Sequence, residues 1–312
     1  TIVIDAKEML QSSELIMETA DPKFVYSAKL SKKPERVSEA LQAQIIDVGQ
    51  MLRETLYEKT ESIAYASATI TIGKDFKNFI GSMGLNSSES SQTDTCLLGS
   101  SYDYDANMQV LVINDIPEPN QPGYLESLQR LLAQAHVAQQ GSMLTLFTNR
   151  REMEACFDAV DPVMKESGLR LVCQKWGVST KGLRDDFLKD EHLSLFALKS
   201  FWEGFDAPGA TLKSVVIPKL PFAKPTDPLS CERALRDQSA WSHYTLPQAV
   251  IEIKQAAGRL IRSSTDKGVL VLADRRLLTK GYGKVFLNSL PSRTIRFCSI
   301  DEAVEVLREN RA

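Results

Sequence analysis

The 312-residue sequence lacks the short glycine-rich motifs that bind nucleotide phosphates. It contains no GxxxxGK[ST] phosphate loop, and no GxGxxG follows a predicted strand. The nearest mimic, TIGKD at residues 71–75, has one glycine and cannot wrap a phosphate group. These absences argue against a dinucleotide-binding dehydrogenase, and against a complete phosphate-loop NTPase within this sequence.

Cysteine and histidine are scarce and scattered. The five cysteines show no CxxC or CxH spacing, and His136, His192 and His243 lie far apart. An odd number of cysteines without pairing signals is typical of a reduced, cytosolic protein, and no metal site is predicted. The absence of a GxSxG turn also leaves Ser-His-Asp hydrolysis without support.

Long apolar runs are absent as well, and so is a net charge of one sign. No run approaches the roughly 18 residues of a membrane helix, and Asp5 and Glu8 interrupt the first apolar stretch, so neither a membrane partner nor a signal peptide is expected. The balance of 37 Lys and Arg against 40 Asp and Glu excludes a protein that is basic overall, but leaves room for a local basic groove. Thr1 is not an initiator methionine, which suggests numbering that starts inside a longer gene product.

What the sequence does contain is a globular composition, with 43% hydrophobic and 25% charged residues, and a regular alternation of apolar runs and amphipathic segments. Residues 1–59 are predicted to be mainly helical with a short strand at 24–30, and 62–70 are predicted to form a buried strand. Further strands are predicted at 110–113, 143–147, 169–172, 193–198, 214–217, 268–273 and 295–300. Helices are predicted at 124–140, 181–188 and 247–262, with another that starts at Thr148 or Asn149 and ends at Gly168.

Strands that are apolar on both faces and separated by helices indicate an α/β fold, in which helices cover both faces of a parallel sheet. A smaller, mainly helical segment precedes this sheet. Parallel sheets bind ligands at the carboxyl ends of their strands, so the loops after Phe147, Leu198, Leu220 and Ala273 are the places to look. Residues 301–304, DEAV, resemble the acidic metal-binding motif of an NTPase. Acidic residues also suit the first turn of a helix, and we favour this interpretation, with residues 301–304 at the start of a terminal helix.

The most informative motif is QxxGRxxR within residues 253–262. Its members are Gln255, Gly258, Arg259 and Arg262. On a helix these positions share one face, and the glycine lets a neighbouring element approach closely. Two guanidinium groups on one face suit a polyphosphate, because guanidinium pairs bidentately with phosphate oxygens. The alternative is a solvated face with surface ion pairs, although the apolar residues 260–261 favour a docked helix.

QxxGRxxR resembles the sixth motif of superfamily two helicases, and QAAGRLIRS (255–263) followed by DKGVLVLADRR (266–276) resembles the DinG family, the bacterial relatives of XPD. Other segments resemble family motifs in the same order. They are YASATI (65–70, third motif), LTLFTN (144–149, fourth), FALKSFWEGFDAPG (196–209, fifth), VIPKLPFAKPTDP (216–228, a Leu-Pro-Phe loop) and YGKVFLNSLP (282–291, the closing segment). The resemblance runs from about residue 60 to the C-terminus.

This resemblance implies a fold and an activity. The family clamps ATP and Mg between two RecA-like domains and moves 5′ to 3′ along single-stranded DNA, with its phosphate loop on the first domain. Residues 1–75 would then be a remnant of the preceding helicase region, ending in the third-motif strand, and 76–312 the second RecA-like domain. The implied partners are single-stranded DNA and the first helicase domain of the same polypeptide, in the cytoplasm. The chain alone should not turn over ATP appreciably, and the iron–sulfur cluster of some members would lie outside it.

The resemblance also implies roles for individual residues. Arg262 is the candidate arginine finger, Arg259 supports it, and Gln255 senses the nucleotide. The residues implied to bind the nucleotide also include Gly258, Glu203, Gly204 and Asp206. The residues implied to contact DNA are Thr148, Asn149, Ser200 and Trp202. Ser67 and Thr69 are implied to couple nucleotide binding to DNA binding.

Each role has a structural alternative. Glu203 and Asp206 also suit a turn, and Thr148 and Asn149 also suit a helix N-cap. Trp202 and Phe222 are candidates for stacking on bases, and their alternative is packing in the core, which we favour for Phe222. Residues 65–66, Tyr-Ala, depart from the hydroxyl residue that the family often has before Ser-Ala-Thr. The competing functional hypothesis is a non-catalytic nucleic-acid-binding or interaction module that keeps the fold but has lost the motor.

Overall fold

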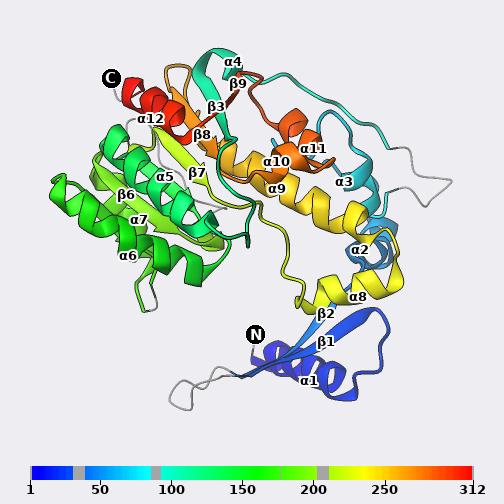
Figure 1. The fold of residues 1–312 in the computed structure, drawn as a ribbon. Coiled ribbons are helices and arrows are strands. Elements are labelled where there is room, and N and C mark those ends of the chain that lie inside the picture. The colour runs from blue at the N-terminus through cyan, green and yellow to red at the C-terminus, as the bar shows by residue number, and fades with distance from the viewer. Residues whose placement is uncertain (1, 31–38, 86–92, 176, 202–210, 311–312) are drawn as a thin grey trace. The chain divides into compact units, whose positions relative to one another are not determined.

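The computed structural model describes residues 2–30, 39–85, 93–175, 177–201 and 211–310 (Figure 1). The chain forms two compact units, each assembled from separate stretches of sequence. Unit 1 comprises Thr1–Thr71, Asp75–Thr95 and Phe222–Gln248, and unit 2 comprises Ile72–Lys74, Cys96–Pro221 and Ala249–Ala312. The predicted division of the chain at residue 75 remains a prediction.

Unit 2 is built around a seven-stranded sheet in which all neighbouring strands run parallel. Its strands, in chain order, are β3 (Met108–Ile113), β4 (Met143–Leu146), β5 (Arg170–Cys173), β6 (Leu193–Ala197), β7 (Ser214–Ile217), β8 (Gly268–Leu272) and β9 (Ile295–Cys298). In space the order is β5-β6-β4-β7-β8-β3-β9. The parallel sheet of the prediction is therefore confirmed, with strand positions that agree to within two residues.

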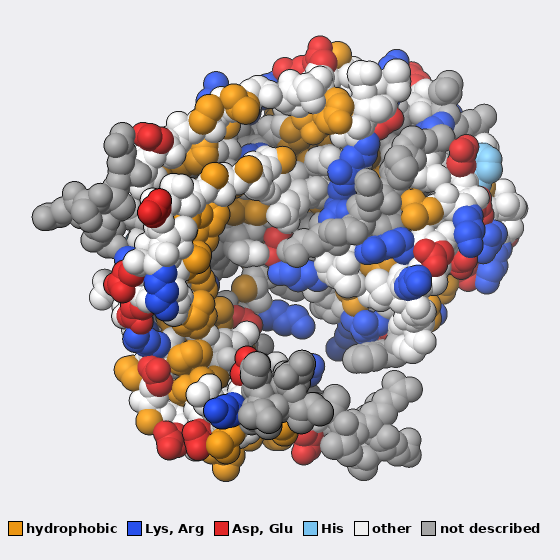
Figure 2. Space-filling view, turned by 180° about the vertical axis from the view of Figure 1, so that it is seen from behind, with side chains coloured by type: hydrophobic (Ala, Val, Ile, Leu, Met, Phe, Trp, Pro, Cys, Tyr) orange, Lys and Arg blue, Asp and Glu red, His pale blue; other side chains and the backbone are white. Residues whose placement is uncertain are grey.

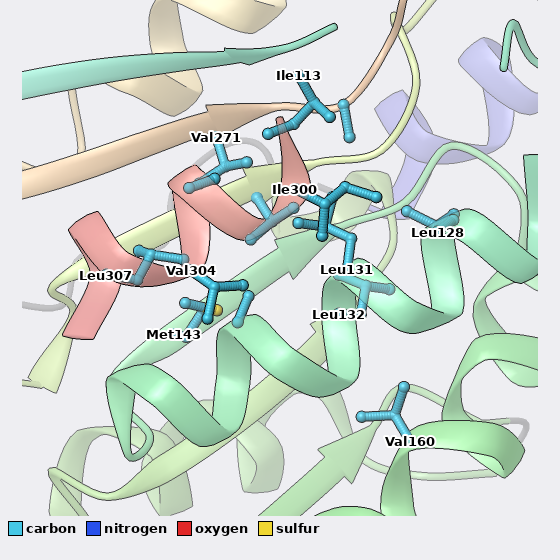
Figure 3. Close-up of a cluster of buried hydrophobic side chains, with 14 of the residues drawn as sticks. Ile113, Leu128, Leu131, Leu132, Met143, Val160, Val271, Ile300, Val304 and Leu307 are labelled. Carbon is cyan, nitrogen blue, oxygen red and sulfur yellow. The ribbon is translucent and has the colours of Figure 1, made fainter. Parts of the chain in front are cut away.

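Helices cover both faces of this sheet. On one face, α5 (Tyr124–Gln139), α6 (Arg150–Glu166) and α12 (Ile300–Glu309) share a single hydrophobic cluster with alternate strand residues such as Val271 (Figure 3). The neighbours Leu270 and Leu272 are equally buried but lie outside that cluster, because successive strand residues point to opposite faces. That leaves α7 (Thr180–Lys189) and α9 (Leu246–Ala257) to cover the second face.

Shorter elements complete unit 2. They are α4 (Tyr104–Asn107), η2 (Lys199–Phe201), α10 (Arg276–Thr279) and α11 (Gly283–Ser289). The acidic residues at 301–302 lie in the first turn of α12, where Ser299 and Glu302 form a reciprocal capping box. The preference for an acidic helix start over a metal-binding box is thus confirmed.

Unit 1 combines the N-terminal region with a later segment of the chain. Its elements are α1 (Ile2–Glu18), the antiparallel pair β1 (Phe24–Lys29) and β2 (Ala40–Ile45), α2 (Val48–Thr55), η1 (Tyr57–Lys59), α3 (Lys77–Ser82), α8 (Pro228–Arg236) and η4 (Trp241–Thr245). Arg233 of α8 donates to the Ile46 carbonyl from Nε at 3.3 Å and Nη2 at 2.9 Å, and its guanidinium lies 4.3 Å from the Tyr244 ring centroid. Phe222 packs beside Trp241 with 6.0 Å between ring centroids.

Two predicted elements are wrong. Residues 62–70 form no strand, and 62–68 are exposed. An extended segment becomes a strand only where a neighbour takes its backbone hydrogen bonds, and no strand of the described chain pairs with it. The helix predicted over 247–262 ends at Ala257 instead. The region 1–59, predicted to be mainly helical with one short strand, contains the antiparallel strands β1 and β2.

Candidate nucleotide and nucleic-acid site

The turn after α9 carries the two arginines of QxxGRxxR, and it is not helical. The last regular helical bond runs from the Gly258 N–H to the Lys254 carbonyl at 3.0 Å, and the amides of Arg259 and Leu260 then bond three residues back. The predicted single helix face is therefore wrong. Glycine has a low helix propensity, which favours an end at this point.

The two guanidinium groups consequently have different surroundings. Arg262 is exposed, whereas Arg259 is only 5% exposed. Residues 260–261 are buried, so the turn is docked as predicted. A Cβ at Gly258 would meet only helix carbonyl oxygens, the nearest at 3.4 Å, so the predicted close approach of a neighbour is not seen among the described residues. Gln255 is half-buried on α9.

Asp266 fixes the backbone at Arg262, and the sequence analysis missed it. Its carboxylate accepts the backbone N–H groups of Arg262 at 2.8 Å and Ser263 at 2.9 Å, and the Ser263 hydroxyl at 2.7 Å. Burial raises the pKa of Asp266, but these hydrogen bonds and the Arg262 charge outweigh it and hold that pKa below its usual value. Burial also raises the pKa of Tyr104 above its usual value, and the charge of Arg262 offsets part of that increase. Only the position of Asp266, four residues after Arg262, could have drawn attention to it.

The loop after β4 contains Thr148 and Asn149. The Asn149 side chain caps α6 by accepting the Arg151 N–H at 2.9 Å, so the N-cap alternative holds for this residue. Asn149 is also exposed and Thr148 half-buried, which leaves both accessible. Their contact with DNA stays a prediction.

Gln174, which directly follows β5, joins three loops at this edge of the sheet. Its Oε1 accepts the Leu198 N–H at 2.8 Å, and its Nε2 donates to the Ser200 Oγ at 2.8 Å. Its backbone carbonyl accepts Nη1 of Arg150 at 2.7 Å. The structure therefore brings the predicted residue Ser200 close to the start of α6, through a glutamine that the sequence analysis did not single out.

Asp274 makes a similar connection between β7 and β8. Its side chain is 1% exposed, accepts the Leu220 N–H at 2.8 Å and pairs with Nη2 of Arg276 at 2.6 Å. Both loops were expected to be functional because they follow sheet strands. The structure shows that a buried carboxylate joins these two loops, and their functional role stays a prediction.

Other predicted residues are either outside the described chain or in open segments. Trp202, Glu203, Gly204 and Asp206 lie outside the described residues. In unit 1, the exposed Ser67 accepts the Thr69 N–H at 3.2 Å and lies in a segment without regular structure.

The described residues include neither a cluster of metal ligands nor a membrane-spanning helix. They contain no group of three or more His, Cys, Asp or Glu side chains able to hold a metal ion. None of their helices is long and apolar enough to cross a membrane. On the face drawn in Figure 2, Lys and Arg side chains gather in several groups, and Asp and Glu side chains lie mostly toward the edges.

The seven-stranded parallel sheet with helices on both faces is an α/β fold of the RecA-like type. A protein-family model described as "Helicase C-terminal domain" matches residues 132–293, just over half of the chain. The chain belongs to this family, and its predicted resemblance to DinG-type helicases is confirmed.

Curated relatives agree with this assignment. The chain is 35% identical over 268 residues to the ATP-dependent DNA helicase YoaA of Escherichia coli, a match that covers 82% of this chain and 41% of the relative. It is 30% identical over 275 residues to the 3′-5′ exonuclease DinG of Bacillus subtilis, which covers 86% of this chain and 29% of that protein. The chain thus spans less than half the length of these relatives.

A solved structure supports the fold. One named XPD_Helicase superposes with a TM-score of 0.62 at 16% identity, covering 90% of this chain and 49% of the other. At this identity the similarity establishes the RecA-like fold, which confirms the predicted fold class.

Proposed function

We propose that this chain is the second motor domain of an ATP-dependent DNA helicase that moves 5′ to 3′ along single-stranded DNA in the cytoplasm. The observation that carries the proposal is the helicase C-terminal family match over residues 132–293. The first helicase domain of the same polypeptide would hold ATP and Mg. That assignment suits a chain whose sequence has no phosphate loop.

In this proposal Arg262 reaches the γ-phosphate as an arginine finger. Arg262 is an exposed residue, its guanidinium can pair with phosphate oxygens, and its backbone N–H is held by Asp266. Arginine fingers contribute about 10³- to 10⁵-fold to phosphoryl transfer by stabilising charge in the transition state. The buried Arg259 would support the turn rather than contact phosphate, and Gln255, near the end of α9, would sense the nucleotide.

The DNA side of the proposal lies at the carboxyl ends of β4 and β6. Thr148, Asn149 and Ser200 offer hydroxyl and amide groups there, and such groups bind the phosphate backbone without reading its sequence. Trp202, Glu203, Gly204, Asp206, Ser67 and Thr69 keep the roles that the family resemblance implies.

The test uses the complete natural protein and the substitution Arg262→Ala. We expect ATPase stimulated by single-stranded DNA to fall at least about 10³-fold, while the dissociation constant for oligo-dT stays within about twofold. Arg308→Ala, which removes an exposed arginine of α12, is the matched control and should leave both unchanged. Near-normal turnover by Arg262→Ala would remove this residue from the site. A wild-type protein that binds DNA without hydrolysing ATP would favour the non-catalytic module.

The isolated chain gives a second test. We expect it to bind single-stranded DNA weakly, with an affinity that falls as salt rises because binding releases counterions from the phosphates. We expect no appreciable ATP hydrolysis, and robust hydrolysis would refute the assignment of the phosphate-binding loop to another domain.

A further inference from the structure

The short segment after β6 is held by side chains from two different directions. On one side, Gln174 binds the Leu198 N–H and the Ser200 hydroxyl, each at 2.8 Å. On the other, the Lys199 ammonium donates to Oε1 of Glu252 at 2.6 Å. Residues 198–200 therefore have defined partners on both sides of the chain.

Glu252 belongs to α9, the helix that leads into the arginine-bearing turn. Its side chain is 2% exposed, whereas that of Lys199 is 67% exposed. A carboxylate this buried is stable as an anion only when a cation or hydrogen-bond donors compensate it. The cation comes from the β6 loop, 53 residues away in the sequence, so the loop and the helix are joined by a charge pair.

The two partners of this ion pair lie next to residues of the two proposed binding sites. Lys199 directly precedes Ser200, which lies on the proposed DNA side. Glu252 lies one helical turn before Gln255, which lies on the proposed nucleotide side. Any displacement of α9 that accompanies nucleotide binding therefore acts on the residue next to a proposed DNA contact.

We propose that Lys199 and Glu252 form a positioning pair that couples nucleotide binding to DNA binding, an inference that rests on the function proposed above. Neither residue needs to touch the reacting phosphate. The pair makes the arrangement of residues 198–200 depend on the position of α9, so each ligand biases the affinity for the other. By thermodynamic linkage the effect must be reciprocal.

The experiment measures that coupling in the complete natural protein. The dissociation constant for fluorescent oligo-dT is determined with and without a saturating non-hydrolysable ATP analogue, and the ratio of the two is the coupling factor. Allosteric coupling factors are typically about 5- to 150-fold, and we expect the wild-type value in this range. Lys199→Met and Glu252→Gln should each bring the ratio to within about twofold of one, whereas Lys199→Arg, which keeps the charge, should retain most of the coupling.

Two comparisons separate coupling from other effects. Glu252→Gln removes no positive charge, so a loss of coupling there cannot come from a lost contact between Lys199 and phosphate. The double variant should lose no more coupling than either single one, because both break the same pair. Lys165→Met is the matched control, since Lys165 pairs with Asp161 of α6 at the same 2.6 Å and is 72% exposed, and it should leave coupling unchanged.

The outcomes distinguish this inference from the proposed function. A wild-type protein without DNA-stimulated ATPase would refute the proposed function and the coupling with it. An active wild type whose coupling factor survives in Lys199→Met, within about twofold, would refute the positioning pair alone. If Glu252→Gln does not fold, Lys199→Met decides the question, because it alters a mostly exposed side chain.

Discussion

His136 should set an acid limit on the stability of unit 2. The imidazole lies on α5 and is 0% exposed, with Nδ1 at 2.8 Å from the Ser194 Oγ and Nε2 at 2.8 Å from the Thr145 Oγ1. A neutral imidazole donates from one nitrogen and accepts at the other, so the two hydroxyls satisfy it completely. Burial lowers the pKa of His136 from 6.5 to about 3.

The size and sign of the effect follow from that difference in pKa. Between pH 6.5 and about 3 the unfolded chain binds a proton at this residue that the folded chain does not. The free energy of unfolding therefore decreases as the pH falls through this window, by about 1.4 kcal/mol per pH unit. At pH 5 His136 alone lowers the free energy of unfolding by about 2 kcal/mol, and well above pH 6.5 it has almost no effect on that free energy.

The assay compares urea unfolding of the wild type and His136→Gln, followed by far-ultraviolet circular dichroism at pH 7.5, 6 and 5. The carboxylates are the same in both proteins, so the difference between their unfolding free energies isolates His136. We expect the wild type to be more stable by about 1–3 kcal/mol at pH 7.5, since its buried polar groups are fully paired, and to lose about 2 kcal/mol of that advantage by pH 5. A difference that does not change with pH, or an NMR titration of the ring with a midpoint near pH 6.5, would refute the reasoning.

Two more predictions concern the arginine-bearing turn and the packing of unit 2. Asp266→Asn weakens three hydrogen bonds, so DNA-stimulated ATPase of the complete protein should fall about tenfold with little change in DNA affinity, whereas Asp301→Asn in the first turn of α12 should leave the rate unchanged. Gly141→Ala should destabilise the chain by more than about 2 kcal/mol in thermal or urea unfolding, because φ is +93° and a Cβ would overlap the His192 carbonyl. Gly168→Ala, at φ +71° with nothing within 4 Å, should cost only about 1–2 kcal/mol, and equal costs would contradict the steric argument.

The sheet was predictable because its signal is local. Fully buried parallel strands must be apolar on both faces, and residues 214–217 were predicted with the bounds that β7 has. The segment 62–70 carries the same β-branched signal, but a strand also needs a partner, which composition does not report. The end of α9 at Ala257 coincides with Gly258, whose low helix propensity favours an end there, and Asp266 then binds the Arg262 amide beyond the helix.

The polar residues that organise the site were not predictable in the same way. Gln174 binds Leu198, 24 residues away, and Asp274 binds Leu220, 54 residues away. A glutamine or an aspartate after a strand is common in any loop, and only the strand order shows which distant amide it reaches. The rule for strand ends directed attention to these loops, but the sequence did not predict the side chains that hold them.

These polar links follow the order of the strands in the sheet. Gln174 connects the ends of β5 and β6, Asp274 connects the ends of β7 and β8, and Arg150, which follows β4, bonds to the carbonyl of Gln174. The loops on both sides of β4 are thus fixed to their neighbours. A displacement of about 1 Å at a reacting centre can cost about 10²-fold in rate, so a group that acts on a phosphate benefits from such a rigid edge. We therefore expect unit 2 to present Arg262 as part of a rigid body, in which Asp266 fixes the turn and the links between strand ends fix the sheet behind it.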